Sequence, residues 1–175
     1  MIYFVRHGES EANQKRIFAG QKDDSLLTEK GREQAKTLAQ EIIAEGIKIN
    51  TIISSPLKRT METAQIIALE LGLDILEIKI DDRIIEYDMG SLSGTPWNPV
   101  INLAEAEGVE DPDLFKNRIE HCIMEISKLP GNTLLVGHGI VARMLKTIKA
   151  GNDPKTFNEM QTLPNASILK IDWLE

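Results

Sequence analysis

The chain has 175 residues, a single cysteine and a formal net charge of −7, from 20 Lys and Arg against 27 Asp and Glu. The length fits one domain covering residues 1–175, and the acidic balance argues against nucleic acid or an anionic membrane as partner. One cysteine cannot form an internal disulfide, so the composition is typical of a protein of the reducing cytoplasm. Composition leaves the oligomeric state open.

The first predicted element is a buried strand, Met1–Val5, which ends at the polar Arg6. This apolar run is far shorter than the roughly 20 apolar residues of a membrane span. After a loop, a helix is predicted from Thr28 to Ile43, because its apolar residues recur at helical spacing and Gly46 provides a stop.

A second strand and helix follow. Thr51–Ile53 ends an apolar stretch, and Ser55–Pro56 combines a capping residue with a proline suited to the first helical position. Gly72 ends this helix. Apolar and charged residues then alternate over 76–80, which predicts a half-buried strand at an edge of the sheet.

Residues 81–112 are rich in Gly, Pro, Asp and Glu and show no sustained periodicity. Loops of this length in compact domains tend to be functional. We therefore expect this segment to form a lid or the rim of a substrate site.

The last third of the chain returns to regular elements. Asp111–Pro112 opens a helix whose inward face includes Cys122, and Thr133–Val136 is the next buried strand. A short helix then runs through Ile148, and Ile168–Ile171 makes a final strand.

Strands that alternate with helices predict an α/β fold, a three-layer sandwich with a mostly parallel central sheet and helices on both faces. In such sheets ligands bind beyond the carboxyl ends of the strands. Polar groups at strand-to-helix junctions are therefore the first candidates for a functional site.

Three such junctions carry polar groups: Arg6–Ser10, Ser54–Arg59 and Gly137–Gly139. Each supplies backbone amides at a helix start, where the helix dipole favours an anion. Arg6 and Arg59 add planar, permanently charged groups that match phosphate oxygens. Together the junctions predict a phosphate site.

Two histidines beside two arginines suit phosphoryl transfer. One imidazole can attack phosphorus while the other donors hold the equatorial oxygens. An attacking histidine must be neutral, and the neighbouring Arg6 and Arg59 favour the neutral form of His7. His138 is then the second histidine of the site.

A leaving alkoxide also needs a proton. Glu86, at the start of the long loop, is the candidate general acid, and an adjacent phosphate favours its protonated form. Glu9 and Asp88 are rival acids. His121 has no other His or Cys at metal-ligand spacing, so we expect it to be structural and no metal site is predicted.

These segments together resemble the histidine phosphatase superfamily, which includes the cofactor-dependent phosphoglycerate mutases and many small phosphatases. The resemblance spans most of the chain and rests on four segments in order. They are Arg6-His7-Gly8-Glu9-Ser10 with Asn13 and the following Leu27-Thr28, Gly31, Gln34 and Ala35; Ser54-Ser55-Pro56-Leu57 with Arg59, Thr63 and Ala64; Glu86 with Gly90 and Gly94; and Val136-Gly137-His138-Gly139.

The resemblance implies a fold like that of the phosphoglycerate mutases and a set of site roles. His7 becomes phosphorylated, Glu86 donates the proton, and water then hydrolyses the phosphohistidine. The phosphate pocket is formed by Arg6, Asn13, Arg59 and His138, and Ala19 and Gly20 lie beside the substrate. No metal or other cofactor is implied.

Between Arg83 and Lys116 the chain has no Lys or Arg, whereas a mutase needs additional cations in its lid. We therefore expect a phosphomonoesterase acting on a small-molecule ester with a neutral or partly apolar leaving group. Rim contacts are then expected from Met89, Leu92 and Trp97. The alternatives are phosphoryl transfer of the phosphoglycerate mutase type and a non-catalytic module that binds a phospholigand.

Overall fold

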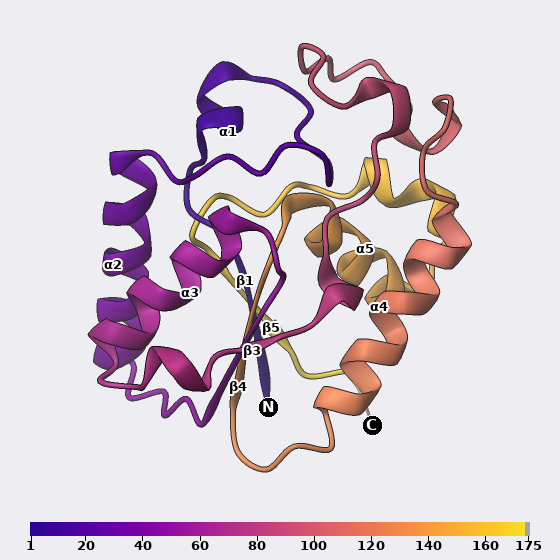
Figure 1. Ribbon diagram of the computed structural model, residues 1–175. Helices are drawn as coiled ribbons and strands as arrows, with labels where there is room; N and C mark the ends of the chain where they lie inside the picture. The colour runs from indigo at the N-terminus through magenta and orange to yellow at the C-terminus, as the bar shows by residue number, and fades with distance from the viewer. Residues whose placement is uncertain (174–175) are drawn as a thin grey trace.

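A five-stranded sheet runs through the centre of the computed structural model, which describes residues 1–173 (Figure 1). Its strands are β1 (Ile2–Arg6), β2 (Thr51–Ser54), β3 (Lys79–Ile80), β4 (Thr133–Gly137) and β5 (Ile168–Ile171). Their order across the sheet is β3-β2-β4-β1-β5. The first four strands are parallel, and β5 pairs antiparallel with β1, so the prediction of a mostly parallel sheet is confirmed.

Helices cover both faces of the sheet, as predicted for a three-layer sandwich. The helices are α1 (Glu11–Lys15), α2 (Glu29–Ala44), α3 (Lys58–Glu70), α4 (Pro112–Ile126) and α5 (Gly139–Ala150). Figure 1 shows α2 and α3 on one side of the sheet and α4 and α5 on the other. Each side has its own apolar core, and the predicted inward residue Cys122 lies in the core beneath α4 and α5.

The strand register brings the three polar junctions to one edge of the sheet. Arg6 of β1 lies opposite Gly137 of β4, and Ser54 of β2 lies opposite Val136. The chain therefore leaves all three strands at the same level, where the loop around α1 and residues 81–112 overhang the sheet (Figure 1).

A close approach of two glycines fixes the first junction against α2. A Cβ added to Gly31 would stand 2.1 Å from the backbone oxygen of Glu9, and one added to Gly8 would stand 2.3 Å from the oxygen of Gly31. The loop that carries the first histidine can therefore lie against the helix only because neither residue has a side chain.

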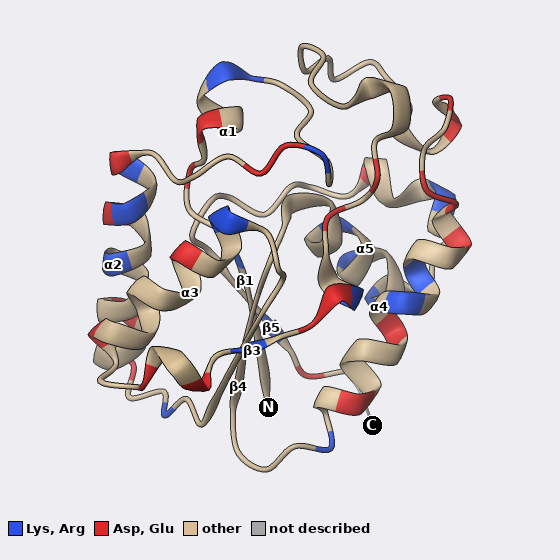
Figure 2. Ribbon diagram, in the orientation of Figure 1, with Lys and Arg blue, Asp and Glu red and all other residues tan. Residues whose placement is uncertain are grey.

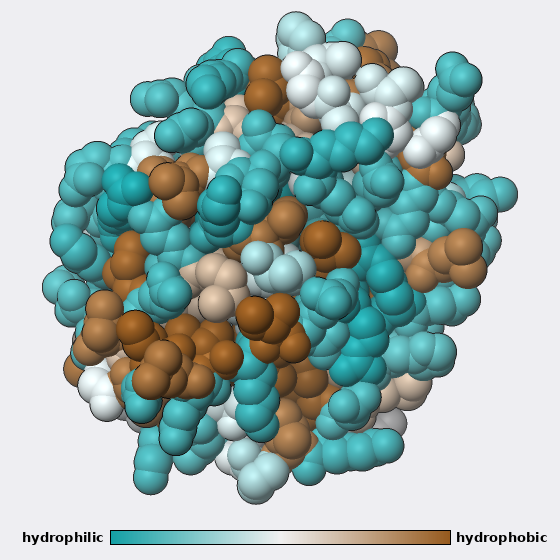
Figure 3. All heavy atoms as spheres, viewed as in Figure 1, coloured by the Kyte–Doolittle hydropathy of each residue, from teal (hydrophilic) through white to brown (hydrophobic). Residues whose placement is uncertain are grey.

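Three details of the sequence prediction are wrong. The short helix α1 lies in a segment predicted as loop. Helix α3 begins at Lys58, with Leu57 as its N-cap, and not at Ser55–Pro56. Residues 75–77 form a short 3₁₀ helix, so the edge strand β3 has only two residues, and Leu76 is 87% exposed. Figure 3 shows this region as an apolar patch at the lower left of the molecule.

Residues 81–112 contain only short 3₁₀ helices, at Asp82–Ile84, Gly90–Leu92 and Leu103–Glu105. This segment is tied to the loop after α1 by backbone hydrogen bonds, including Trp97 N to Arg16 O at 2.8 Å and Gly94 N to Phe18 O at 2.7 Å. Lid movement stays a prediction. Within residues 1–173 no helix is long and apolar enough to cross a membrane.

Candidate functional site

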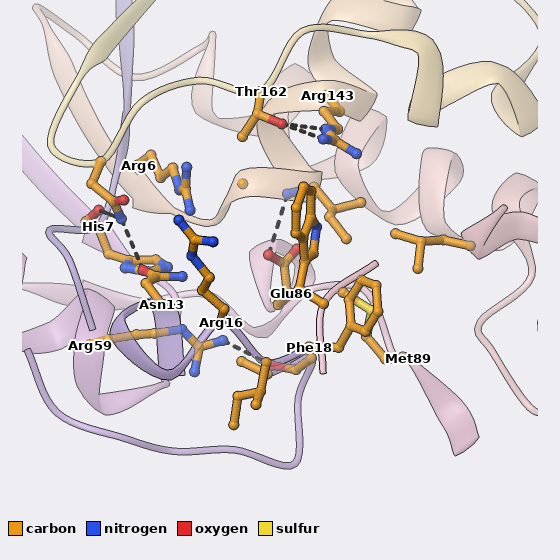
Figure 4. Close-up of a pocket in the computed structure, with 18 residues that line it drawn as sticks. Arg6, His7, Asn13, Arg16, Phe18, Arg59, Glu86, Met89, Arg143 and Thr162 are labelled. Carbon is orange, nitrogen blue, oxygen red and sulfur yellow. Dashed lines mark hydrogen bonds between the residues drawn. The ribbon is translucent and has the colours of Figure 1, made fainter. Parts of the chain in front are cut away.

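A cavity of about 440 Å³ lies where the three junctions meet the overhanging loops (Figure 4). Its volume falls within the range of small-molecule sites. Of the predicted site residues, eight line it: Arg6, His7, Asn13, Ala19, Gly20, Arg59, Glu86 and Met89. Trp97 also lines it, whereas Leu92 does not and instead packs against the core beneath α4 and α5. A contact between Leu92 and the substrate stays a prediction, and its packing against the core does not support it.

The hydrogen bonding of His7 defines which ring nitrogen faces a ligand. Its Nδ1 lies 2.7 Å from the backbone oxygen of Gly8. A carbonyl oxygen can only accept, so Nδ1 carries the proton and Nε2 of the neutral ring keeps a lone pair. Burial, followed by the positive charges of Arg59 and Arg6, holds the pKa of His7 well below its usual value of 6.5. His7 is therefore a neutral base with a free Nε2.

Arg6 and Arg59 flank His7, and backbone oxygens hold both side chains. Arg6 Nη1 donates to Leu163 O at 2.7 Å, while Arg59 donates to Asp23 O at 2.6 Å and to Gly20 O at 2.9 Å. Burial lowers the pKa of both guanidiniums, and the negative charge of Glu86 opposes this effect. Both side chains are thus fixed, partly desolvated cations suited to an anion.

His138 is buried next to His7 and does not itself line the cavity. The two ring centroids are 5.4 Å apart, and His138 Nε2 lies 2.7 Å from Ser55 Oγ. Ser55 therefore positions a histidine and does not cap α3. Three buried side-chain atoms in the described part of the chain lack a hydrogen-bond partner, and two of them are His138 Nδ1 and Arg6 Nε. Buried polar side-chain atoms without a partner are rare, which makes this corner a candidate place for a ligand.

Asn13 lines the cavity and also organises the first junction. Its Oδ1 accepts hydrogen bonds from Ser10 N at 3.2 Å and from Asn165 Nδ2 at 3.1 Å. Asn165 Nδ2 also donates to His7 O at 3.0 Å. Since the oxygen of Asn13 is engaged, its NH₂ group is the part that can donate to an anion.

The three candidate acids lie in different places. Glu86 is the only carboxylate among the described residues that line the cavity, and it is 7% exposed. Its two oxygens accept from Tyr87 N at 3.0 Å and from Ile140 N, in the first turn of α5, at 3.3 Å. Glu9 is paired with Lys30 at 2.8 Å, and Asp88 accepts from Gly90 N. Geometry therefore favours Glu86.

The backbone around Glu86 is braced by two long side chains. Gln21 Nε2 donates to Glu86 O at 2.8 Å, and Arg118 donates to the same oxygen at 3.1 Å and to Ile85 O at 2.8 Å. Arg118 is itself held by both oxygens of Glu110. The carboxylate thus sits on a fixed segment although it belongs to a long loop.

Two cavity arginines escaped the sequence prediction. Arg16 follows α1, and Arg143 lies on α5 (Figure 4). A signal for the second was available, because residue 143 stands four positions after Gly139 and so on the same helical face as the junction. The expectation of few cations holds for residues 84–115, whose ribbon shows no blue in Figure 2, but it does not hold for the cavity.

The site offers phosphate-binding groups rather than metal ligands. Within residues 1–173 no group of three or more His, Cys, Asp or Glu side chains could hold a metal ion. A neutral histidine with a free nitrogen, clamped between two arginines and facing one carboxylate, can attack a phosphorus atom and protonate a departing oxygen. The arrangement fits phosphoryl transfer through histidine.

Comparisons with known proteins show which proteins the chain resembles. The chain is 36% identical over 190 residues to "Probable phosphoglycerate mutase GpmB" of Enterobacter sp. (strain 638), covering 99% of the chain and 85% of the relative. The protein of the same name from Salmonella choleraesuis is 34% identical over 193 residues, with the same coverage.

Solved structures share the fold. YhfR of Bacillus stearothermophilus superimposes with a TM-score of 0.82 at 24% identity, covering 98% of this chain and 91% of that one. A mycobacterial glucosyl-3-phosphoglycerate phosphatase gives a TM-score of 0.79 at 23% identity, covering 95% and 90%. Residues 2–175 match the family described as the Histidine phosphatase superfamily (branch 1), and the chain belongs to that superfamily.

Proposed function

We propose that the protein is a metal-independent phosphomonoesterase that acts through a phosphohistidine intermediate on a small-molecule phosphate ester. The observation that carries this proposal is the state of His7. Its Nδ1 proton is held by Gly8 O at 2.7 Å, its ring is kept neutral by burial and two arginines, and its Nε2 is free to attack.

In the first step, His7 Nε2 attacks phosphorus, a P–N bond forms and the ester P–O bond breaks. Arg6, Arg59 and the Asn13 amide hold the phosphoryl oxygens and stabilise the charge that develops on them. Glu86 gives its proton to the departing alkoxide, which leaves as an alcohol.

In the second step a water molecule gives its proton to the Glu86 carboxylate and attacks the phosphorus of phosphohistidine. The P–N bond breaks, inorganic phosphate forms and His7 is returned to its neutral state. The guanidiniums provide positive charge in both steps, so no divalent cation is needed. His138 is buried next to His7 and has an unpaired Nδ1; when Ser55 Oγ donates to its Nε2, that Nδ1 carries the proton and can donate to a phosphoryl oxygen.

The proposed surroundings follow the same observations. We expect no nucleic acid or membrane partner, because the net charge of −7 opposes both. The single Cys122 is a free, buried thiol, which supports a reducing cytoplasm as the place of action.

A second candidate is mutase-type transfer between two positions of one substrate. Relatives at 34–36% identity are named probable phosphoglycerate mutases, and the cavity holds more arginines than one phosphate requires. Hydrolysis remains the preferred proposal, since residues 84–115 supply no cation to the cavity's outer wall.

The test is release of inorganic phosphate from phenyl phosphate in the presence of EDTA. The wild type is expected to turn over, and His7→Gln, which keeps a polar side chain of similar size, is expected to lose at least about 1,000-fold in kcat/KM. Activity that depends on an added metal ion would contradict the proposal.

The same preparation separates the alternatives. Incubation with 3-phosphoglycerate, followed by analysis of the products, would give 2-phosphoglycerate if the protein were a mutase and glycerate with phosphate if it were a phosphatase. A correctly folded wild type that binds phosphate but turns over no ester would be a binding module.

A further inference from the structure

Arg143 is a half-buried cation whose partners in the described structure are neutral. Its Nε donates to Thr162 Oγ1 at 2.8 Å, its Nη2 donates to the same oxygen, and its Nη1 lies 3.5 Å from Asn158 Oδ1. A guanidinium has five N–H donors, so two remain for a ligand. No carboxylate within residues 1–173 forms an ion pair with it, and burial lowers its pKa. Such a cation is stabilised when an anion binds.

Arg16 is the second unused cation. Its side chain lines the cavity, and within residues 1–173 that side chain makes neither a hydrogen bond nor an ion pair. Its backbone is in the left-handed region, with φ 51°, and its carbonyl accepts from Trp97 N at 2.8 Å. This conformation ends helix α1, for which Arg16 is the C-cap, and it fixes the point from which the side chain leaves the backbone.

The charges of the cavity exceed the need of one phosphate ester. Four arginines line it against the single carboxylate of Glu86, and a phosphate monoester carries at most two negative charges. Arg6 and Arg59 flank the nucleophile and account for the reacting phosphate. Arg16 and Arg143 have no part in holding that phosphate, and both line the same cavity, Arg16 extending toward Arg6 and Arg143 lying beside Thr162 (Figure 4).

We propose that Arg16 and Arg143 form a second anion subsite, so that the substrate is a phosphate ester whose leaving group carries its own carboxylate or second phosphate. This inference rests on the proposed function and deepens it. It replaces the sequence-based expectation of a neutral leaving group.

The cavity also has an apolar part of its wall. Phe18, Met89, Leu103 and Ile140 line the cavity together with Trp97. A short carbon skeleton fits this wall, with the reacting phosphate at one end and the second anion at the other.

Binding of non-hydrolysable phosphonates tests the subsite without relying on turnover. The three probes are 4-hydroxybutylphosphonate, 4-phosphonobutanoate and propane-1,3-diylbisphosphonate, whose far ends are an alcohol, a carboxylate and a second phosphonate. By calorimetry, the wild type is expected to bind one or both of the doubly anionic probes at least about tenfold more tightly than the alcohol. The doubly anionic probe that binds more tightly, the carboxylate or the bisphosphonate, identifies the second anion.

The variants Arg143→Gln and Arg16→Gln are expected to lower that preference, by about tenfold and about threefold respectively, since Arg16 is the more exposed. Lys15→Gln and Lys149→Gln are matched controls: each removes one positive charge from the neighbouring residue or the same helix, outside the cavity lining. Both are expected to keep the wild-type preference.

Equal affinity of the wild type for all three probes would overturn the subsite. An equal loss of affinity for all three probes in both variants would also overturn it, because the arginines would then bind the reacting phosphate. Phenyl phosphate hydrolysis is measured on the same samples. Hydrolysis of phenyl phosphate without a preference for the doubly anionic probes would refute the subsite alone. A preference for those probes without hydrolysis would refute the proposed function alone.

Discussion

His7 keeps its lone pair because of three neighbours that act together. The Gly8 carbonyl fixes the Nδ1 proton, and burial beside Arg59 and Arg6 disfavours a second proton on the ring. The same environment extends to His138, whose pKa is also held well below 6.5 by burial and then by Arg59. Both rings therefore stay neutral in the folded protein at neutral pH.

Two buried neutral histidines make stability depend on pH. As the pH falls through about 6.5, the two histidines bind protons in the unfolded chain but not in the folded chain. Unfolding therefore takes up protons, and its free energy decreases as the pH falls. The contribution of the two histidines to the free energy of unfolding is expected to be constant above about pH 6.5. Below that pH it is expected to decrease by up to about 1.4 kcal/mol per pH unit for each histidine. Urea unfolding between about pH 5 and pH 8 measures this slope.

His7→Asn should reduce the slope between about pH 5 and pH 6.5 by roughly half, because one of the two buried rings is gone. His121→Asn is the matched control, since its ring is exposed on α4, and it should leave the slope unchanged. An unaltered slope in His7→Asn would contradict the neutral state of this histidine.

Glu86 is the proposed general acid, and comparing substrates with good and poor leaving groups in a Glu86 variant tests that role. Glu86→Gln keeps the size of the side chain but cannot donate a carboxylic proton. We expect kcat for an alkyl phosphate to fall at least about 100-fold, while 4-nitrophenyl phosphate, whose leaving group needs no proton, loses less than about tenfold. Steady-state kinetics on both esters decides the matter, and equal losses would remove Glu86 from this role.

Among the elements, helix α2 holds the loop that carries His7 through contact between backbones. Gly31→Ala would put a Cβ 2.1 Å from Glu9 O, so the helix or the loop must shift. In an ordinary helix this substitution stabilises by up to about 1 kcal/mol. Here we expect a loss of about 2 kcal/mol or more in the free energy of unfolding, with reduced kcat.

Chemical unfolding monitored by circular dichroism measures this loss. Gln40→Ala, at an exposed position of the same helix, is the control and is expected to change stability by less than about 0.5 kcal/mol. A Gly31→Ala protein as stable as the wild type would show that the close approach does not hold the loop.

Across the whole molecule, the sequence predicted best where burial and polarity change abruptly. Buried strands that end in Arg6-His7 and Gly137-His138 could be predicted from pattern alone, and the parallel sheet brings them together. The start of α3 could not, because Ser55 looks like a cap but bonds to His138, 83 positions further along the chain. A local pattern carries no information about such a contact.

The acidic net charge shows the same limit. Averaged over 175 residues it indicates a surface that repels polyanions, and the segment 84–115 has no cation. Yet folding gathers Arg16 and Arg143, which lie 127 positions apart, at the same cavity as Arg6 and Arg59. The charge that a substrate meets is therefore opposite in sign to the net charge of the protein, and only the tertiary structure reveals it.

The central claim is that phosphate passes through His7, and trapping that intermediate tests it most directly. The wild type is mixed with phenyl phosphate, quenched in alkali within milliseconds, digested and analysed by mass spectrometry. We predict a phosphoryl group on His7 that is stable in alkali, lost in acid, and absent from His7→Gln. Turnover without any label on His7, or with the label on another residue, would contradict the account.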